Sequence, residues 1–266
     1  MNSFSGILRT DMRRAIFSKN FCFAILMTLA VLLGVCWGDI KSPATSIVYF
    51  VNYGISVGDA VSLFIVIPTF VYASSFVVDK KTGFFPFQRA RVSLKNYSFS
   101  KFFATGVSGG LALVGGLLVF LVVLKIMGHD FFPTDVEISS NFSDVVFSDL
   151  LIGKFQPLYF LAFGFIFFMQ GFFWACLGLA VSSVFTEVYI TFAAPFVLQF
   201  LILQLFWAFP GLPPLLNPVQ LGRANIYGHT TVEVLLFAYG YFLFLALVCG
   251  AFFYFQLKRR SARNDI

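Results

Sequence analysis

The stretch from Asp79 to Lys101 alternates aromatic and cationic side chains in a pattern that suits contact with another molecule. Its central part reads Phe84-Phe85-Pro86-Phe87-Gln88-Arg89-Ala90-Arg91. Aromatic residues and arginine are enriched at protein interfaces, and the helix-breaking residues Gly83 and Pro86 beside them favour a short helix. The pattern predicts either a short helix that docks in a groove of another protein or a basic loop that lies on anionic lipid. Composition leaves both interpretations open.

Side chains that could catalyse a reaction inside a membrane are scarce. Ionisable residues at membrane depth usually mark ion paths or catalytic sites, and the charge-free apolar windows described below contain none. His129 and His229 fall in predicted outer loops, and we interpret Gln170, Gln199 and Gln204 as interhelical hydrogen-bonding residues. The sequence has no GxxxxGK[ST] loop for ATP phosphates. We therefore expect no catalytic residue, metal site or cofactor in this chain, and we do not expect an enzyme.

The composition places much of the surface in lipid. Of the 266 residues, 59% are apolar and only 11% charged, and the mean hydropathy is +0.88; soluble domains carry about 25% charged residues. A spanning helix needs ~20 consecutive apolar residues, and none of the candidate windows alternates as barrel strands do. The charge-free windows are 21–38, 60–78, 102–124, 157–181, 188–209 and 234–257. We predict an all-α integral membrane protein with six transmembrane helices in a single domain over residues 1–266.

The distribution of charge predicts the orientation. With the N-terminus inside, the inner segments hold fourteen of the eighteen lysines and arginines, and the outer segments keep Lys41, Lys125, Lys154 and Arg223. Acidic residues show the opposite bias, so the inner face sums to +10 and the outer face to −4. Cytoplasmic loops carry an excess of Lys and Arg. We predict cytoplasmic termini and a multi-pass plasma-membrane protein, in bacteria the cytoplasmic membrane, with no nucleic-acid partner.

The connections between the windows differ in character. Residues 1–20 predict a basic amphipathic helix in the inner interface, and its characteristic side chains are Arg9, Met12, Arg13, Arg14 and Phe17. Residues 79–101 form a basic inner loop, and residues 125–156 form the largest outer segment. Residues 210–233 hold four prolines, which predicts short re-entrant or surface half-helices.

Small residues spaced by four recur in the predicted helices. The pairs are Gly106 and Gly110, Gly171 and Ala175, and Gly178 and Ser182. This spacing lets helices approach closely. It serves packing within one chain as well as dimerisation, and the sequence leaves that choice open.

The arrangement of these segments resembles the type-2 ABC transporter permeases, the ABC-2 family. In that family the second helix commonly ends in an acidic residue with glycine four positions later, followed by a Pro-Val-Ser-like stretch and a lysine that opens the third helix. Asp79, Gly83, Val92-Ser93 and Lys101 match this order, whereas Arg91 stands where proline is usual. Asn217-Pro218 is similar to the family's outer re-entrant segment. The resemblance covers the whole chain by topology, but its motifs are degenerate.

The resemblance implies a half-transporter. Two permease subunits, identical or homologous, would pair around a central path, and each would rest its inner loop on a cytoplasmic P-loop ATPase that binds ATP and magnesium. The residues that would couple to that ATPase are Asp79, Gly83, Phe84, Phe85, Arg89, Arg91 and Lys101, together with the N-terminal interfacial helix.

Three classes of function follow from the sequence. The first is the permease subunit of an ATP-driven exporter that moves a hydrophobic or amphipathic peptide, lipid or drug. The second is a carrier or channel that works without nucleotide. The third is a membrane anchor, assembly or immunity subunit without a transport path. Transport in liposomes that contain this chain alone would favour the second class, and a co-purifying ATPase would favour the first.

Overall fold

The computed structural model describes residues 4–40, 45–56, 61–132, 146–152, 156–213, 216–222 and 230–263, and these residues form helices and connecting turns without a strand. Six helical segments among them are long and apolar enough to cross a membrane, as the sequence predicts. Five are single helices: α2 (Lys19–Cys36), α7 (Leu94–Ile126), α10 (Gln156–Ser182), α11 (Val188–Ala208) and α13 (Thr231–Ala262). The remaining span, Ser62–Lys81, consists of α4 (Val61–Tyr72) and α5 (Ser75–Lys81), with a turn between them.

Two spanning helices extend beyond the charge-free windows, because capping residues rather than the first charge set their ends. Helix α7 begins at Leu94, where the Ser93 side chain accepts a hydrogen bond from the backbone N–H of Asn96. Helix α13 begins after Thr230, which forms a capping box with Glu233. The predicted windows themselves contain no ionisable residue, but the longer helical segments that include them do, and Asp79 and Lys101 lie just outside their windows.

Short helices occupy the connections. They are α1 (Phe4–Ile16), α3 (Ile47–Ser56), α6 (Phe84–Arg91), α9 (Ser148–Ile152) and α12 (Pro218–Gly222). The predicted inner loop 79–101 is thus mostly helical. Of the predicted segments 125–156 and 210–233, the structure describes only parts, and His229 lies outside the described residues.

Helices α7 and α10 pack closely at the centre of the bundle because glycines remove side chains from both surfaces. A Cβ atom added to Gly109 would lie 2.5 Å from Cβ of Ala175, and one added to Gly171 would lie 2.7 Å from the carbonyl oxygen of Gly109. On the next helical turns, Gly106 and Gly110 lie against the side chains of Phe172 and Phe168 in the same way. The small residues at these positions therefore serve packing within the chain.

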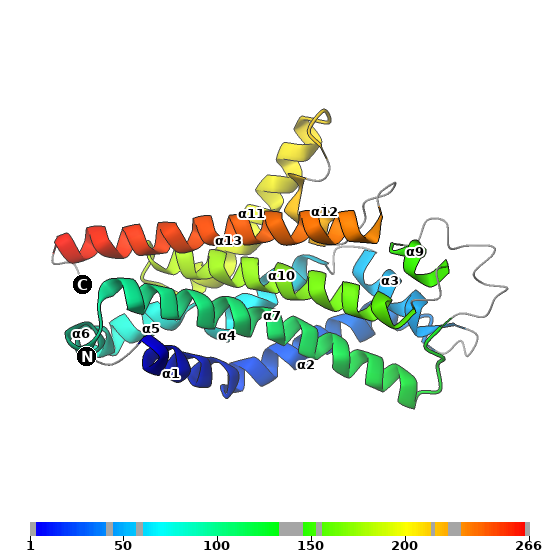
Figure 1. The fold of residues 1–266 in the computed structure, drawn as a ribbon, viewed down its shortest axis with the longest axis horizontal. Coiled ribbons are helices and arrows are strands. Elements are labelled where there is room, and N and C mark those ends of the chain that lie inside the picture. Colours follow the sequence, from blue (N-terminus) through cyan, green and yellow to red (C-terminus); the bar gives the residue numbers. More distant parts are fainter. Residues whose placement is uncertain are drawn as a thin grey trace.

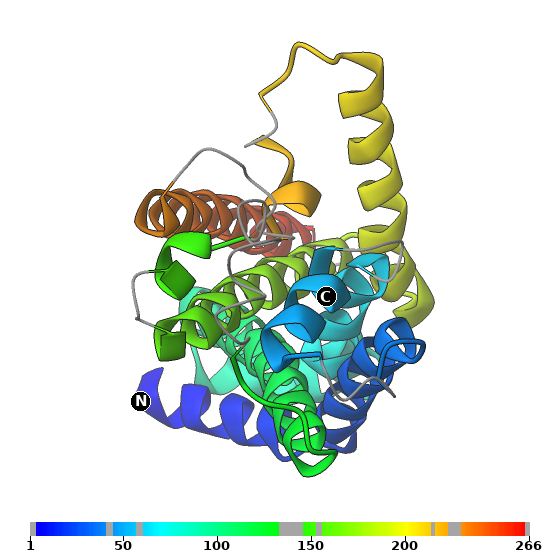
Figure 2. The same ribbon diagram turned by 90° about the vertical axis from the view of Figure 1, so that its right-hand side faces the viewer.

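Helix α11 stands apart from the rest of the bundle over much of its length, as Figures 1 and 2 show. Its side chains are mostly apolar and exposed, and Trp207 near its end is 86% exposed. One polar contact ties it to α4, since the Gln199 amide donates to the Ser62 hydroxyl. This contact confirms the interhelical interpretation for Gln199. Gln204 is exposed, and Gln170 is buried with no hydrogen-bond partner among the described residues.

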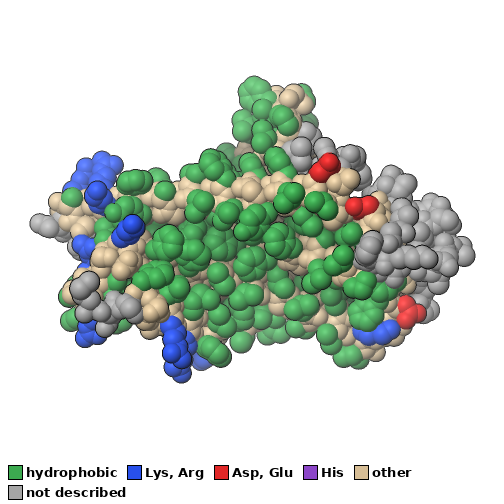
Figure 3. Space-filling view, viewed as in Figure 1, with side chains coloured by type: hydrophobic (Ala, Val, Ile, Leu, Met, Phe, Trp, Pro, Cys, Tyr) green, Lys and Arg blue, Asp and Glu red, His purple; other side chains and the backbone are tan. Residues whose placement is uncertain are grey.

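Basic side chains gather at one end of the bundle. Helix α1 begins, and α13 ends, at the same end of the long axis, which also holds α5, α6 and the start of α7 (Figure 1). On the face shown in Figure 3, Lys and Arg side chains concentrate at this end, apolar side chains form a broad band, and the visible Asp and Glu side chains lie at the opposite end. We refer to the end that holds α6 as the cationic end.

Candidate functional site

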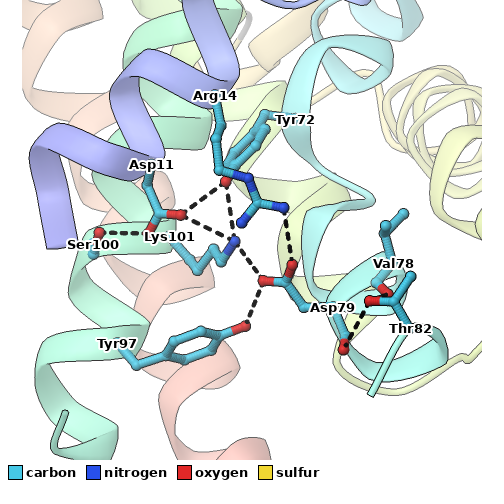
Figure 4. A network of polar contacts seen from close by, with 9 residues as sticks. All are labelled: Asp11, Arg14, Tyr72, Val78, Asp79, Thr82, Tyr97, Ser100 and Lys101. Atoms are coloured by element: carbon cyan, nitrogen blue, oxygen red, sulfur yellow. Dashed lines mark hydrogen bonds and ion pairs between the residues drawn. The ribbon is translucent and has the colours of Figure 1, made fainter. Parts of the chain in front are cut away.

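Lys101 lies in the second turn of α7 and is completely buried. Its ammonium nitrogen is 2.7 Å from Oδ2 of Asp79 on α5 and 3.2 Å from Oδ1 of Asp11 on α1. Both carboxylates are also buried, with side-chain exposures of 1%. One cation therefore joins two acidic side chains from separate elements inside the cationic end of the bundle (Figure 4).

The carboxylate of Asp11 has a partner on each oxygen. The Tyr72 hydroxyl donates to Oδ1 over 2.8 Å, and the Ser100 hydroxyl donates to Oδ2 over 2.6 Å. Lys101 in turn donates to the Tyr72 oxygen at 3.0 Å. Buried polar groups cost little only when they are fully hydrogen-bonded, and this half of the network meets that condition.

The carboxylate of Asp79 is satisfied in the same way. Arg14 donates to Oδ1 over 3.2 Å, and the Tyr97 hydroxyl donates to Oδ2 over 3.3 Å. The Arg14 guanidinium also lies 5.4 Å from the ring centre of Phe84, within the range of a cation–π contact. Partial burial disfavours its charged form, but Tyr72 and Asp79 outweigh that effect, so the pKa of Arg14 is raised.

The two carboxylates and two basic groups make the network formally neutral; Asp11, Asp79 and Lys101 are buried, whereas the Arg14 side chain is 40% exposed. Charges of opposite sign attract strongly in a low-dielectric interior, but removing one partner leaves an uncompensated buried charge. Displacing α1 from α5 and α7 would separate these pairs. The network therefore connects the four elements α1, α4, α5 and α7, and we expect them to move as one unit.

Asp11 is the charged member of the network that the sequence did not identify as a site residue. The side chains of α1 that are buried are Asp11 and Ala15, one helical turn apart, and Ile7 one turn earlier packs against the core. An acidic residue at the centre of an apolar stripe with helical spacing is a detectable signal. This signal is weak in the sequence because α1 is short and its other faces are rich in charged residues.

Helix α6 begins shortly after Asp79 in the sequence, and three contacts hold it against the bundle. It begins after Gly83, whose φ of +71° is a left-handed conformation that favours glycine. The Phe85 ring inserts between Phe76 and Tyr97, with ring-centre distances of 5.6 and 5.2 Å. Arg89 donates to the Ser261 hydroxyl of α13 over 3.0 Å, and Phe84 meets Arg14 of α1, as described above.

The structure divides the predicted coupling residues into two groups. Asp79, Phe85 and Lys101 are internal, so they cannot touch a partner directly. The exposed side chains of α6 include Phe84, Phe87 and Arg91. Phe87, at 69%, is more exposed than Phe84. Phe87 was not among the predicted site residues, although its position in the aromatic and cationic stretch pointed to it.

The N-terminal residues predicted at the membrane interface also separate. Arg9, Arg13 and Phe17 are exposed, and Phe17 is 84% exposed at the end of α1. Met12 packs partly against the core, whereas Arg14 is exposed along part of its side chain and pairs with the buried Asp79. Helix α1 is thus held by its apolar stripe and by the ion pair of Asp11, and its placement at a lipid interface stays a prediction.

Comparison with known proteins adds no relative: no protein-family model matches the chain, and no curated protein matches it. The ABC-2 resemblance therefore depends on the order of Asp79, Gly83, Val92-Ser93 and Lys101 and on the arrangement of helices. Among the residues that the structure describes, no group of three or more His, Cys, Asp or Glu side chains could hold a metal ion.

Proposed function

We propose that this chain is the membrane-spanning permease subunit of an ATP-driven exporter of the ABC-2 type. In this proposal a separate cytoplasmic P-loop ATPase binds ATP and magnesium, and the permease itself has no catalytic residue. The observation that carries the proposal is α6, a short helix at the cationic end with an exposed aromatic and cationic surface and a buried anchor. Phe87 is exposed, and Arg91 lies one helical turn further along α6. Aromatic and arginine side chains are enriched among the residues that contribute most to binding at the centre of an interface.

The anchoring of α6 supports a mechanical role. Arg14 links it to α1 and to Asp79, Phe85 links it to α5 and α7, and Arg89 links it to α13. A partner that pushes on α6 would therefore act on several elements at once, because packed elements transmit displacement. Closure of the ATPase on ATP would then shift these helices between inward-open and outward-open arrangements.

The remaining features of the proposal concern the second subunit and the substrate. Helix α11 carries exposed apolar residues along its length, including Phe200, Leu205 and Trp207, and such a surface can contact lipid or another helix. A second permease subunit packed on this side would give the central path. Its apolar lining would suit a hydrophobic or amphipathic substrate, such as a peptide, lipid or drug.

The test is to isolate the tagged full-length chain from its native membrane in a mild detergent and to identify what is retained. A P-loop ATPase should co-purify with the unaltered chain, and the double variant Phe87→Ala, Arg91→Glu should recover at least about tenfold less of it, since interface anchors each contribute about 2 kcal/mol or more. Reversing Arg89 together with Arg91 should also uncouple transport, but Arg89 has an internal partner and is the less selective choice.

The control is the variant Phe244→Ala, Lys125→Glu, which replaces an exposed phenylalanine and reverses an exposed cation outside α6 and outside the proposed subunit interface. It should retain the ATPase. Equal recovery from the α6 variant and the unaltered chain would contradict docking through α6. Gradient-driven transport by this chain alone in liposomes would instead identify a nucleotide-independent carrier.

A further inference from the structure

A groove of 410 Å³ lies between α7 and α13 toward the cationic end of the bundle. Its walls come from one stripe on each helix: Lys95, Ser98, Phe99 and Phe102 on α7, and Leu247, Gly250, Ala251 and Tyr254 on α13. The two helices run in opposite directions, so the start of α7 meets the end of α13 (Figure 1). Where they approach closest, a Cβ atom on Gly250 would lie 2.8 Å from the Phe102 ring, which closes the back of the groove.

On both helices the side chains that face the groove change in the same order with distance from the cationic end, from charged to hydroxyl-bearing to apolar. On α7 the cation Lys95 comes first, the hydroxyl of Ser98 one turn deeper, and the ring of Phe102 one turn deeper again. On α13, Tyr254 lies one turn deeper than Lys258, and Ala251 and Leu247 follow on the same face. From Lys258 to Leu247 the stripe is about 16 Å long, at 1.5 Å per residue. Cation, hydroxyl and hydrocarbon therefore follow one another over the dimensions of a headgroup and the upper part of an acyl chain.

The charge at the mouth of this groove is not neutralised within the described residues. Lys95 lines the groove, and Lys258 lies one helical turn beyond Tyr254, the last lining residue on α13. Both lysines are exposed, and neither forms an ion pair among the described residues. The acidic side chains described at this end are Asp11, Asp79 and Glu187, and all three are engaged with other basic residues: Lys101, Arg14 and Lys81. Arg260 donates to the carbonyl of Val184, so its side chain points toward the connection between α10 and α11. The free positive charge favours an anionic headgroup.

We propose that this groove is a binding site for an anionic phospholipid from the membrane leaflet at the cationic end. Lys95 and Lys258 hold the phosphate, the hydroxyls of Ser98 and Tyr254 lie at the level of the glycerol and ester groups, and an acyl chain lies along Phe99, Ala251 and Leu247. The site is independent of the proposed transport function, because it uses neither α6 nor an ATPase.

The experiment is native mass spectrometry of the purified full-length chain, titrated with phosphatidylglycerol or with phosphatidylcholine of identical acyl chains. The first phosphatidylglycerol should bind about fivefold more tightly per engaged lysine, as expected for ~1 kcal/mol per cation near an anionic lipid. The double variant Lys95→Gln, Lys258→Gln should lose this preference. The variant Ala251→Phe, which fills the groove, should weaken the first binding event for both lipids.

Charge-matched controls separate a specific site from a general attraction. The variant Arg13→Gln, Lys19→Gln removes two exposed cations near the same end but away from the groove, and it should keep the preference. Equal loss in this control, or equal affinity of the unaltered chain for the two lipids, would overturn the proposal. Glycerol phosphate at millimolar concentration should not displace the lipid; displacement would show that the mouth binds a free phosphate and that the apolar stripe has no part. Unchanged thermal unfolding of each variant, followed by tryptophan fluorescence, shows that a loss of binding is not a loss of fold.

Discussion

At the scale of single residues, Lys101 combines two properties that seldom occur together. It lies in a spanning helix and is fully buried, yet its charge is balanced by two carboxylates and it donates to a tyrosine oxygen. A buried ion pair adds little net stability compared with an apolar replacement of all partners, but loss of one partner is costly. The network should therefore matter most for the relative position of the elements it joins.

Replacement of Lys101 by methionine should lower the free energy of unfolding by about 3–5 kcal/mol, because it leaves Asp11 and Asp79 buried without a shared cation. Unfolding of the purified chain by increasing SDS in mixed micelles, followed by fluorescence, measures the change. The additional substitution Asp11→Asn should cost less in the Lys101→Met background than on its own, since the two residues interact directly.

Lys125 provides the control for this substitution. It is also on α7 and 3.2 Å from an acidic oxygen, that of Asp130, but both side chains are well exposed. Its replacement by methionine should change the unfolding free energy by less than about 1 kcal/mol. Similar losses from the two replacements would show that burial of the network does not set its energetic importance.

At the scale of elements, the contact between α7 and α10 depends on the absence of side chains. The added Cβ of Gly171 would meet the backbone of Gly109, which cannot move without moving the helix. In lipid, helix association depends on this kind of close packing, because hydrocarbon solvates apolar side chains as well as another helix does.

Gly171→Ala should therefore destabilise the protein by about 1–3 kcal/mol through overpacking. Gly164→Ala, on the same helix, should be neutral or stabilising by up to ~1 kcal/mol, since nothing lies within 4 Å of its added Cβ and alanine is the better helix former. Apparent melting temperatures in one detergent measure both effects. Equal shifts in the same direction would mean that the steric contact does not limit packing.

At the scale of the whole molecule, the separation of charge along the bundle predicts its orientation in the membrane. Basic side chains collect at the end that holds both the start of α1 and the end of α13 (Figures 1 and 3). The rule that links Lys and Arg to the cytoplasmic side assigns that end to the cytoplasm. The proposed ATPase contact and the proposed lipid site both lie at this end.

Cysteines introduced by Ala90→Cys and Ala262→Cys, in a background with Cys22→Ser, should react with a membrane-impermeant thiol reagent only after the membrane is opened, whereas Ser140→Cys should react in intact cells. Gel shifts after labelling give the result. The reverse pattern would place α6 outside the cell and remove the basis for a cytoplasmic ATPase.

The helices and their number could be predicted from the sequence because lipid imposes a simple requirement. Every backbone polar group in the bilayer needs an internal partner, so long apolar stretches become helices whatever their neighbours are. The windows thus located the spans, but α7 begins eight residues earlier than its window, at the Ser93 cap. Its first turns include Lys101, whose carboxylate partners sequence order does not reveal. Local features, such as the left-handed turn at Gly83 and the short helix after it, were also within reach of sequence reasoning.

Hydropathy, length and charge, which act residue by residue, were sufficient to determine that this chain is helical, has six helical segments long and apolar enough to cross a membrane, and sorts its charges to two ends. Only the tertiary structure decided that Asp11 belongs with Asp79 and Lys101, that Phe85 turns inward while Phe87 stays exposed, and that the glycines of α7 and α10 meet within one chain. The physical reason is that these contacts join residues up to 90 positions apart. The energy of a buried charge or a close helix contact depends on which surface lies opposite, and that surface exists only after the helices have packed.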